Sequence, residues 1–301
     1  MVFFTKDAGR FECGGPFGRP TSTRTLTGSG VELDGVPFAN NGDVRLRYEV
    51  DGDGGADDEA VVFCGDAGLG AWQFGWQHGA LVGPHRVITP EPRGIGKSDT
   101  PPGPYSVAEL ASDLEAVLRD AGVRTAHLVG YGLGGMVALA HSDRSSRAES
   151  LVLLGTAASG DAYNAEGVWA DPNDPAAVTA TLSALLSADF RERRPEELDR
   201  IADWRVAEDA DPDVFAAHRD AVEAFDCAGR LYEFTTPALV IHGGGDAVCP
   251  PTAGETLAEG LPRGEFEALP EAGHLVGVEA SAAVNDLLAG WLAEHASDPF
   301  A

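Results

Sequence analysis

The fold of this chain is decided by the stretch Ala126-His127-Leu128-Val129-Gly130-Tyr131-Gly132-Leu133-Gly134-Gly135-Met136-Val137-Ala138-Leu139. It begins with an apolar run typical of a buried strand, passes through a glycine-rich corner and ends in an apolar run typical of a helix. A sharp strand-to-helix corner of this kind presents the side chain of its central residue above the edge of a sheet. The central residue here is Gly132, which has no side chain to present.

Outward from this corner, apolar runs that indicate buried strands alternate with helical patterns. The expected strands lie at 60–64, 86–90, 151–154, 238–242 and 265–269, after an opening hairpin at 37–50. Continuous apolar runs are typical of parallel strands covered on both faces. Helices are expected near 71–81, from Ser106, whose capping box with Glu109 marks a helix start, and at the end of the chain. This order predicts an α/β fold with a mostly parallel central sheet flanked by helices.

The alternation stops between residues 158 and 235, where helical segments follow turn signals such as Asp174-Pro175 and Asp211-Pro212. We interpret residues 158–235 as a helical cap inserted into a core formed by 36–157 and 236–296. Residues 1–30 hold four basic and two acidic residues, unlike the acidic remainder. We therefore expect residues 1–35 to form a loosely ordered N-terminal extension, or translated upstream sequence with the functional start nearer Val31, and residues 1–30 to be dispensable for folding.

The composition excludes several classes of partner. The chain has 48 acidic and 21 basic residues, a formal net charge of −27, and only two lysines, Lys6 and Lys97. Such a surface repels nucleic acid and anionic membranes. It is typical of proteins from salt-rich cytoplasms, because dissolved cations screen the self-repulsion. We predict a halophilic protein that loses structure when salt is removed; a merely acidic protein is the alternative.

The cysteines indicate a reducing compartment. Cys13, Cys64, Cys227 and Cys249 show no C-x-x-C spacing and no secretory context. We expect reduced thiols in a cytoplasmic protein. No apolar run approaches the length of a membrane span.

Function in an open parallel sheet collects in the loops at the carboxyl ends of the strands. Four such loops stand out, namely the glycine corner and residues 64–72, 242–250 and 271–279. With these four motifs in order, the chain resembles the capped α/β-hydrolases, a group that includes 3-oxoadipate enol-lactonases, haloperoxidase-like esterases, and epoxide or haloalkane hydrolases. The resemblance covers about residues 36–296.

The resemblance implies a role for one residue in each loop. It makes Asp246 the acid and His274 the base of a catalytic triad, with Gly132 at the position of the nucleophile. It places the oxyanion hole at the backbone N–H groups of Leu133 and Asp66. Arg93-Gly94-Ile95-Gly96-Lys97-Ser98-Asp99 matches the family's structural R-G-x-G-x-S segment, in which Ser98 is not the nucleophile.

Two departures from the family pattern matter. Cys64-Gly65 stands where the family has His-Gly, which leaves the backbone donors of the oxyanion loop in place. Gly132 removes the covalent chemistry, because glycine offers no atom that can attack a substrate. Ordinary esterase turnover is therefore not expected. Gly132 is either a turn glycine without catalytic meaning, or it leaves space for a hydrolytic water molecule with His274 as its base.

Three interpretations follow. The chain is an atypical hydrolase that acts on a small ester, lactone or epoxide-like substrate through Asp246, His274 and water; or it is a non-catalytic protein that binds a ligand or partner under its cap. The third is an ordinary serine hydrolase in which the elbow serine has been replaced. No metal-ligand spacing and no nucleotide-binding loop occur, so no metal or cofactor is expected. Cys64 and His242 are weaker candidates that we expect to be parts of the core.

Overall fold

The computed structural model describes residues 36–52 and 59–296. The predicted N-terminal extension and Cys13 lie outside the described residues, so these predictions stay open.

An eight-stranded sheet forms the centre of the molecule, in the order β1-β2-β4-β3-β5-β6-β7-β8. The strands are β1 (Phe38–Asn41), β2 (Val44–Asp51), β3 (Glu59–Cys64), β4 (Val87–Pro90), β5 (Thr125–Tyr131), β6 (Ala148–Leu154), β7 (Ala238–Gly243) and β8 (Gly264–Leu269). From β4 to β8 all neighbours are parallel, and the β1–β2 hairpin adds to β4 antiparallel. Because β3, β5 and β7 are buried along almost their whole length, they read as continuous apolar runs.

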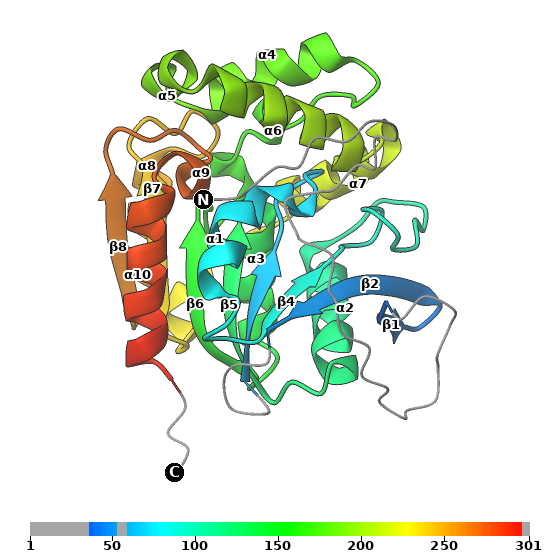
Figure 1. The fold of residues 1–301 in the computed structure, drawn as a ribbon. Coiled ribbons are helices and arrows are strands. Elements are labelled where there is room, and N and C mark those ends of the chain that lie inside the picture. Colours follow the sequence, from blue (N-terminus) through cyan, green and yellow to red (C-terminus); the bar gives the residue numbers. More distant parts are fainter. Residues whose placement is uncertain (1–35, 53–58, 297–301) are drawn as a thin grey trace.

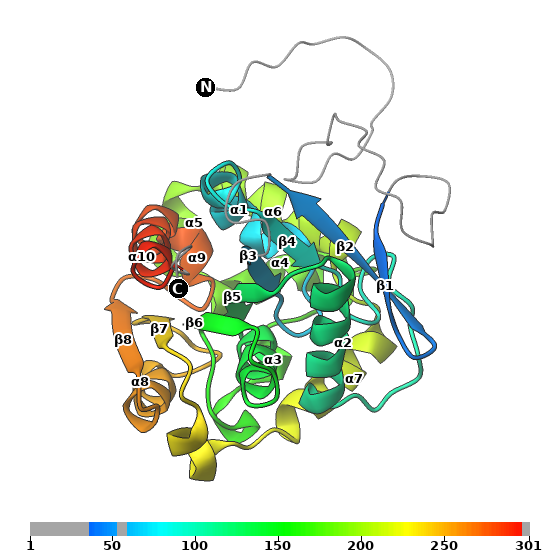
Figure 2. The same ribbon diagram turned by 90° about the horizontal axis from the view of Figure 1, so that it is seen from below.

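Helices cover both faces of this sheet, as predicted (Figures 1 and 2). One face carries α1 (Gly75–Leu81), α9 (Val276–Glu279) and α10 (Ser281–Glu294), and the other carries α2 (Val107–Asp120), α3 (Leu133–Ser142) and α8 (Pro251–Gly260). The predicted capping box begins α2, where Ser106 Oγ accepts the Glu109 N–H at 3.2 Å. In α10, Val284, Leu288, Trp291 and Leu292 are buried and form one apolar face of the helix. The fold is thus the predicted α/β-hydrolase arrangement.

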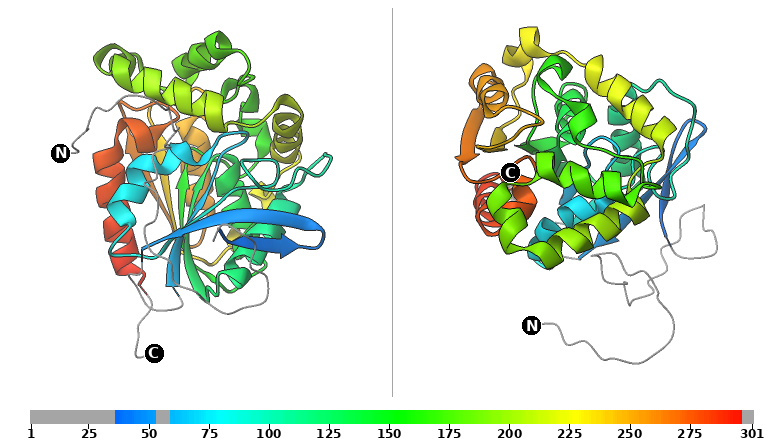
Figure 3. Two further views of the ribbon diagram at one scale, coloured as in Figure 1. Left: turned by 45° about the vertical axis from the view of Figure 1, so that its right-hand side comes forward. Right: turned by 90° about the horizontal axis from the view of Figure 1, so that it is seen from above.

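A layer of helices lies over the carboxyl ends of the strands (Figures 1 and 3). It consists of α4 (Pro175–Leu185), α5 (Ala188–Arg193), α6 (Pro195–Glu208) and α7 (Pro212–Glu223). Short 3-10 turns at Gly160–Ala162, Ala165–Gly167 and Ala228–Glu233 join it to the core. Prolines at the first turn of α4, α6 and α7 correspond to the turn signals in the sequence. The helical insertion therefore covers the edge at which the candidate residues lie.

Among the described residues, no helix is both long and apolar enough to cross a membrane.

Candidate active site

The corner between β5 and α3 has the strained geometry of an elbow. Gly132 has φ +49° and ψ −113°, a region that residues with a side chain rarely adopt. The turn also brings two backbones together, because a Cβ on Gly134 would lie 1.9 Å from the carbonyl oxygen of Cys64. Thr156 Oγ1 donates a hydrogen bond of 2.7 Å to the Gly132 carbonyl oxygen. The glycines of this motif therefore hold the start of α3 against the end of β3.

His274 and Asp246 meet at the carboxyl edge of the sheet. His274 Nδ1 lies 2.8 Å from Asp246 Oδ2, and the other carboxylate oxygen accepts the N–H groups of Val248 and Cys249 at 2.8 and 2.9 Å. The Tyr131 hydroxyl donates to the backbone oxygen of His274 at 2.5 Å. The loop after β7 thus orients a carboxylate, and that carboxylate orients the imidazole with Nε2 facing the elbow.

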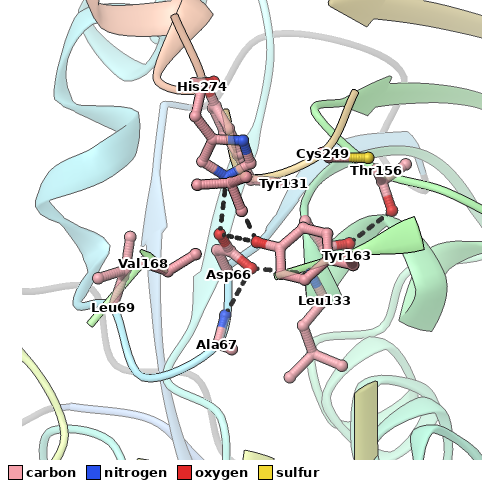
Figure 4. Close-up of polar contacts among 12 residues, drawn as sticks. Asp66, Ala67, Leu69, Tyr131, Leu133, Thr156, Tyr163, Val168, Cys249 and His274 are labelled. Carbon is pink, nitrogen blue, oxygen red and sulfur yellow. Dashed lines mark hydrogen bonds and ion pairs between the residues drawn. The ribbon is translucent and has the colours of Figure 1, made fainter. Parts of the chain in front are cut away.

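The side chain of Asp66, from the loop after β3, lies at the centre of the site (Figure 4). Its Oδ1 accepts the backbone N–H groups of Ala67 at 2.7 Å and Leu133 at 2.9 Å. Its Oδ2 accepts the Tyr163 hydroxyl at 2.6 Å and lies 3.2 Å from His274 Nε2. One carboxylate therefore contacts the elbow helix, the base and a tyrosine that precedes the cap helices.

This carboxylate takes the place that a side chain at position 132 would need. A Cβ built on Gly132 would lie 2.0 Å from Asp66 Oδ1 and 2.5 Å from the Tyr163 hydroxyl oxygen. The expected space for a water molecule beside Gly132 is therefore absent from this structure. That interpretation is corrected: Gly132 makes room for the Asp66 carboxylate.

Two backbone N–H groups point at Asp66 Oδ1, and only one of them, that of Leu133, belongs to the oxyanion pair that the resemblance implies. Leu133 N–H has the expected direction, whereas the Asp66 N–H donates to Gln73 Oε1 at 3.0 Å. Ala67, one residue further along the loop, supplies the N–H that converges with that of Leu133. Gln73 Nε2 in turn donates to the Gly70 carbonyl oxygen at 2.8 Å and fixes the curvature of this loop.

The charges in the cluster are strongly coupled. Burial by itself lowers the pKa of His274, but the negative charges and hydrogen bonds of Asp246 and Asp66 raise it to about 10. Burial opposes ionisation of Asp246, yet the charge and hydrogen bond of His274 outweigh it and lower the pKa of Asp246. Burial and the nearby Asp66 raise the pKa of the Tyr163 hydroxyl well above its usual value. Charge and hydrogen bonding in the cluster therefore favour the protonated form of His274 and the neutral form of Tyr163.

The cluster is closed to solvent. Asp66 and His274 are 1% and 0% exposed, and Tyr163 is 7% exposed. A nearby apolar cavity is lined by residues that include Phe63, Cys64 and His218, but not by Asp66, Tyr163 or His274. A substrate reaches Asp66 only when Tyr163 or the adjoining cap segment moves.

The weaker candidates from the sequence, Cys64 and His242, are buried in the core. Cys64 is buried, which raises its pKa to about 12, and no hydrogen bond is found between its thiol and the Asp66 cluster. His242 is buried, which lowers its pKa to about 4. Ser98 Oγ donates to the Glu91 carbonyl oxygen at 2.6 Å, consistent with its structural role in the family. Within residues 36–52 and 59–296, no cluster of side chains could hold a metal ion.

Three features of the site were missed by sequence reasoning: the side chain of Asp66, the Tyr163 hydroxyl and the loop support from His218. His218 on α7 accepts the Gly68 N–H at 3.1 Å through Nδ1, and its Nε2 lies 3.2 Å from the Arg93 carbonyl oxygen. A charged residue in a loop at the end of a buried strand, close to a corner whose central residue is a glycine, was the available signal for Asp66. No local pattern marks Tyr163, which lies 97 residues from Asp66.

This geometry agrees with the similarity of the chain to known proteins. A family model described as "Alpha/beta hydrolase family" matches residues 61–287. The chain belongs to the alpha/beta hydrolase family. The predicted resemblance is confirmed at this level.

Relatives within the alpha/beta hydrolase family include enzymes of several substrate classes. The chain is 34% identical over 273 residues to "Putative carbamate hydrolase RutD" of Variovorax paradoxus, with 82% of this chain and 96% of that protein covered. The structure is similar to the enol-lactonase of Burkholderia xenovorans, at 27% identity and a TM-score of 0.76, covering 85% of this chain and 100% of the other. It is also similar to Est816, described as an N-acyl homoserine lactone degrading enzyme, at 28% identity and a TM-score of 0.70, covering 84% of this chain and 99% of that one.

Proposed function

We propose that this chain is a hydrolase of a small ester, lactone, carbamate or epoxide-like substrate that binds under the helical insertion. The observation that carries the proposal is the orientation of His274 by Asp246, with Nε2 facing the Asp66 carboxylate that the Ala67 and Leu133 N–H groups hold. Burying charges is costly, and a site without function would not need to keep this ion pair and the two N–H donors buried. The hydrolases among its relatives support the same reaction class.

His274 is the acid–base group of this proposal. Its Nε2 lies on the side of the ring opposite Asp246 and faces the reacting centre. General acid–base catalysis by such a group contributes typically 10²–10⁴-fold to the rate. The water attacks from a direction other than the one that the serine hydroxyl of the family takes, because Asp66 fills that position.

The test is hydrolysis of four probes by the full chain and by His274→Ala. The probes are p-nitrophenyl acetate, γ-butyrolactone, phenyl carbamate and styrene oxide. We expect turnover of at least one probe, with a loss of roughly 10²-fold or more in the variant. His141→Ala is the matched control, because His141 of α3 is buried, with Nε2 2.9 Å from Glu115 Oε2 of α2, and takes no part in the site.

A second candidate function is binding without turnover. It is favoured by the closed cluster, in which the Asp66 carboxylate already occupies both convergent N–H groups. Absence of turnover for all four probes, or turnover that His274→Ala leaves unchanged, would support this candidate over the hydrolase.

The third interpretation, an ordinary serine hydrolase with a replaced serine, has less support. A serine Cβ at position 132 would collide with the Asp66 carboxylate in its present place. A serine at this position therefore requires the Asp66 carboxylate to turn away from the elbow.

A further inference from the structure

The geometry points to Asp66 as the nucleophile of this site, with the carbon of a small epoxide as its electrophile. This inference rests on the proposed function and narrows its substrate class. The reacting group then belongs to the loop after β3 and not to the elbow. It occupies the space that a side chain at position 132 would need.

The position of the carboxylate supports this role. Asp66 Oδ1 lies 2.0 Å from the place of a Cβ on residue 132, so the carboxylate lies where the elbow would present its nucleophile. Hydrogen bonds from Ala67 and Leu133 fix Oδ1. Oδ2 carries no backbone contact and faces Tyr163 and His274. Oδ2 is therefore the oxygen that can attack, and Oδ1 is the oxygen that is held.

The hydrogen bonds to Asp66 Oδ1 indicate which kind of electrophile the site can use. Attack on an acyl carbonyl needs N–H donors for the carbonyl oxygen of the substrate, and both donors here are already used by Oδ1. Displacement at a saturated carbon develops no such oxyanion in its first step. The donors become useful in the second step, when Oδ1 itself takes the negative charge.

The proton donors next to Asp66 favour an epoxide over a substrate that loses an anionic leaving group. Ring opening produces an alkoxide that must be protonated, and two proton carriers converge on Oδ2. His274 Nε2 lies 3.2 Å and the Tyr163 hydroxyl 2.6 Å from Oδ2, and these two groups are 3.3 Å apart. An epoxide also releases no fragment, so the closed cluster needs no separate binding site for a leaving group.

The reaction balances with water as the only co-reactant. Asp66 Oδ2 bonds to an epoxide carbon while the ring C–O bond breaks, and the epoxide oxygen takes the proton of His274 Nε2. His274, now neutral, takes a proton from water, and the water oxygen bonds to Asp66 Cγ. The charge on Oδ1 is held by Ala67 and Leu133 N–H, the Cγ–Oδ2 bond breaks, and the departing alkoxide takes the second water proton. The products are a vicinal diol, the carboxylate and the imidazolium.

The charge of Asp66 influences whether His274 donates a proton, as ring opening requires, or accepts one, as ester hydrolysis requires. In the resting site both carboxylates raise the pKa of His274, which suits it to donate a proton. Ester formation removes the negative charge of Asp66, so the pKa of His274 falls and the ring becomes a base when water must be activated.

An isotope experiment on the full chain tests this assignment. The protein turns over styrene oxide many times in water enriched in oxygen-18, and the proteolytic peptide that contains Asp66 is weighed by mass spectrometry. We expect heavy oxygen in Asp66, because each cycle replaces Oδ2 by a water oxygen. The peptide with Asp246 is the internal control and stays unlabelled.

A variant provides the kinetic arm. Asp66→Asn keeps an oxygen for the Ala67 and Leu133 N–H groups but weakens the nucleophile, and we expect a loss of at least roughly 10³-fold in epoxide turnover. Its thermal unfolding is measured alongside, and the isotope result on the unaltered chain holds even if this variant folds poorly.

The outcomes separate this inference from the proposed function. Turnover of any probe that depends on His274, with heavy oxygen only in the product, overturns Asp66 as the nucleophile and leaves the hydrolase intact. Absence of turnover of every probe by the unaltered chain overturns both. Heavy oxygen in Asp66 during epoxide turnover supports both.

Discussion

Gly132 and Asp66 are complementary residues. The carboxylate of Asp66 occupies the space that a side chain at position 132 would need, and it accepts the N–H of the next residue, Leu133. Its negative charge is compensated by His274, by the Tyr163 hydroxyl and by the Ala67 N–H. A buried charge of this kind is tolerated because every lone pair that faces the protein has a partner.

This complementarity predicts the effect of restoring a serine at the elbow. Gly132→Ser adds a side chain at φ +49°, which costs about 1–3 kcal/mol, and places its Cβ against Asp66 Oδ1. We expect a lower melting temperature for Gly132→Ser and partial recovery for Gly132→Ser combined with Asp66→Ala. Thermal unfolding of both variants checks this, and p-nitrophenyl acetate hydrolysis shows whether the new hydroxyl works with His274. A single variant as stable as the unaltered protein would contradict the placement of Asp66.

At the scale of elements, the end of α6 connects the helical insertion to the loop that carries Asp66. Glu208 Oε2 accepts the Trp72 N–H at 3.1 Å, and Asp209 Oδ1 accepts the Trp72 indole N–H at 2.8 Å and the Gly70 N–H at 3.1 Å. Arg205 Nε lies 2.7 Å from the other Asp209 oxygen. The insertion is thus joined by hydrogen bonds to the loop that carries Asp66.

Ionisation of the half-buried Glu208 is expected to destabilise the fold as the pH rises. Burial raises the pKa of Glu208 to about 7, above the value of about 4.3 in an unfolded chain. The stability gained from the protonated form is present below about pH 4.3 and is lost as the pH rises through 7. We expect Glu208→Gln to raise the free energy of unfolding by about 1 kcal/mol at pH 8 and to leave it unchanged at pH 4. Denaturant unfolding at both pH values measures this.

Glu255→Gln, at an exposed position in α8, is the control and should show no such difference between the two pH values. An equal effect of Glu208→Gln at both pH values would show that ionisation of Glu208 does not change the stability of the fold.

At the scale of the whole molecule, the main electrostatic feature is the net charge of −27. Arginines such as Arg205 and Arg93 are buried in ion pairs with Asp209 and Asp113. They compensate local carboxylates inside the molecule, and the exposed acidic residues far outnumber the cations left to balance them. Repulsion between surface carboxylates acts over about 30 Å at 0.01 M salt and about 3 Å at 1 M.

We therefore predict that salt stabilises this protein. The melting temperature should rise between about 0.01 M and about 1 M potassium chloride, since the shorter screening length removes most of the repulsion. Calorimetric scans at both concentrations test this, with sucrose as an uncharged control that does not screen. Equal melting at both salt concentrations would favour a merely acidic protein over the halophilic one.

The sequence predicted the fold well because its signals are local. The glycine corner at Gly130 to Gly134, the apolar run of β3 and the capping box at Ser106 each depend on neighbours in the chain, and the structure confirms the elements that they predict. The resemblance also implied that Asp246 and His274 act together as acid and base, and in the structure they pair at 2.8 Å. Asp66 was singled out for its backbone, on family grounds, and its side chain was overlooked.

By itself, the sequence indicated a member of the alpha/beta hydrolase family with a glycine, Gly132, at the centre of the strand-to-helix corner, because strand, corner and helix are encoded in consecutive residues. Only the tertiary structure decided what stands beside that glycine. The Asp66 carboxylate is held there by Leu133, Tyr163 and His274, which are 67, 97 and 208 residues away in the chain. Contacts over such separations follow from how the loops pack at the sheet edge, and no local pattern contains them.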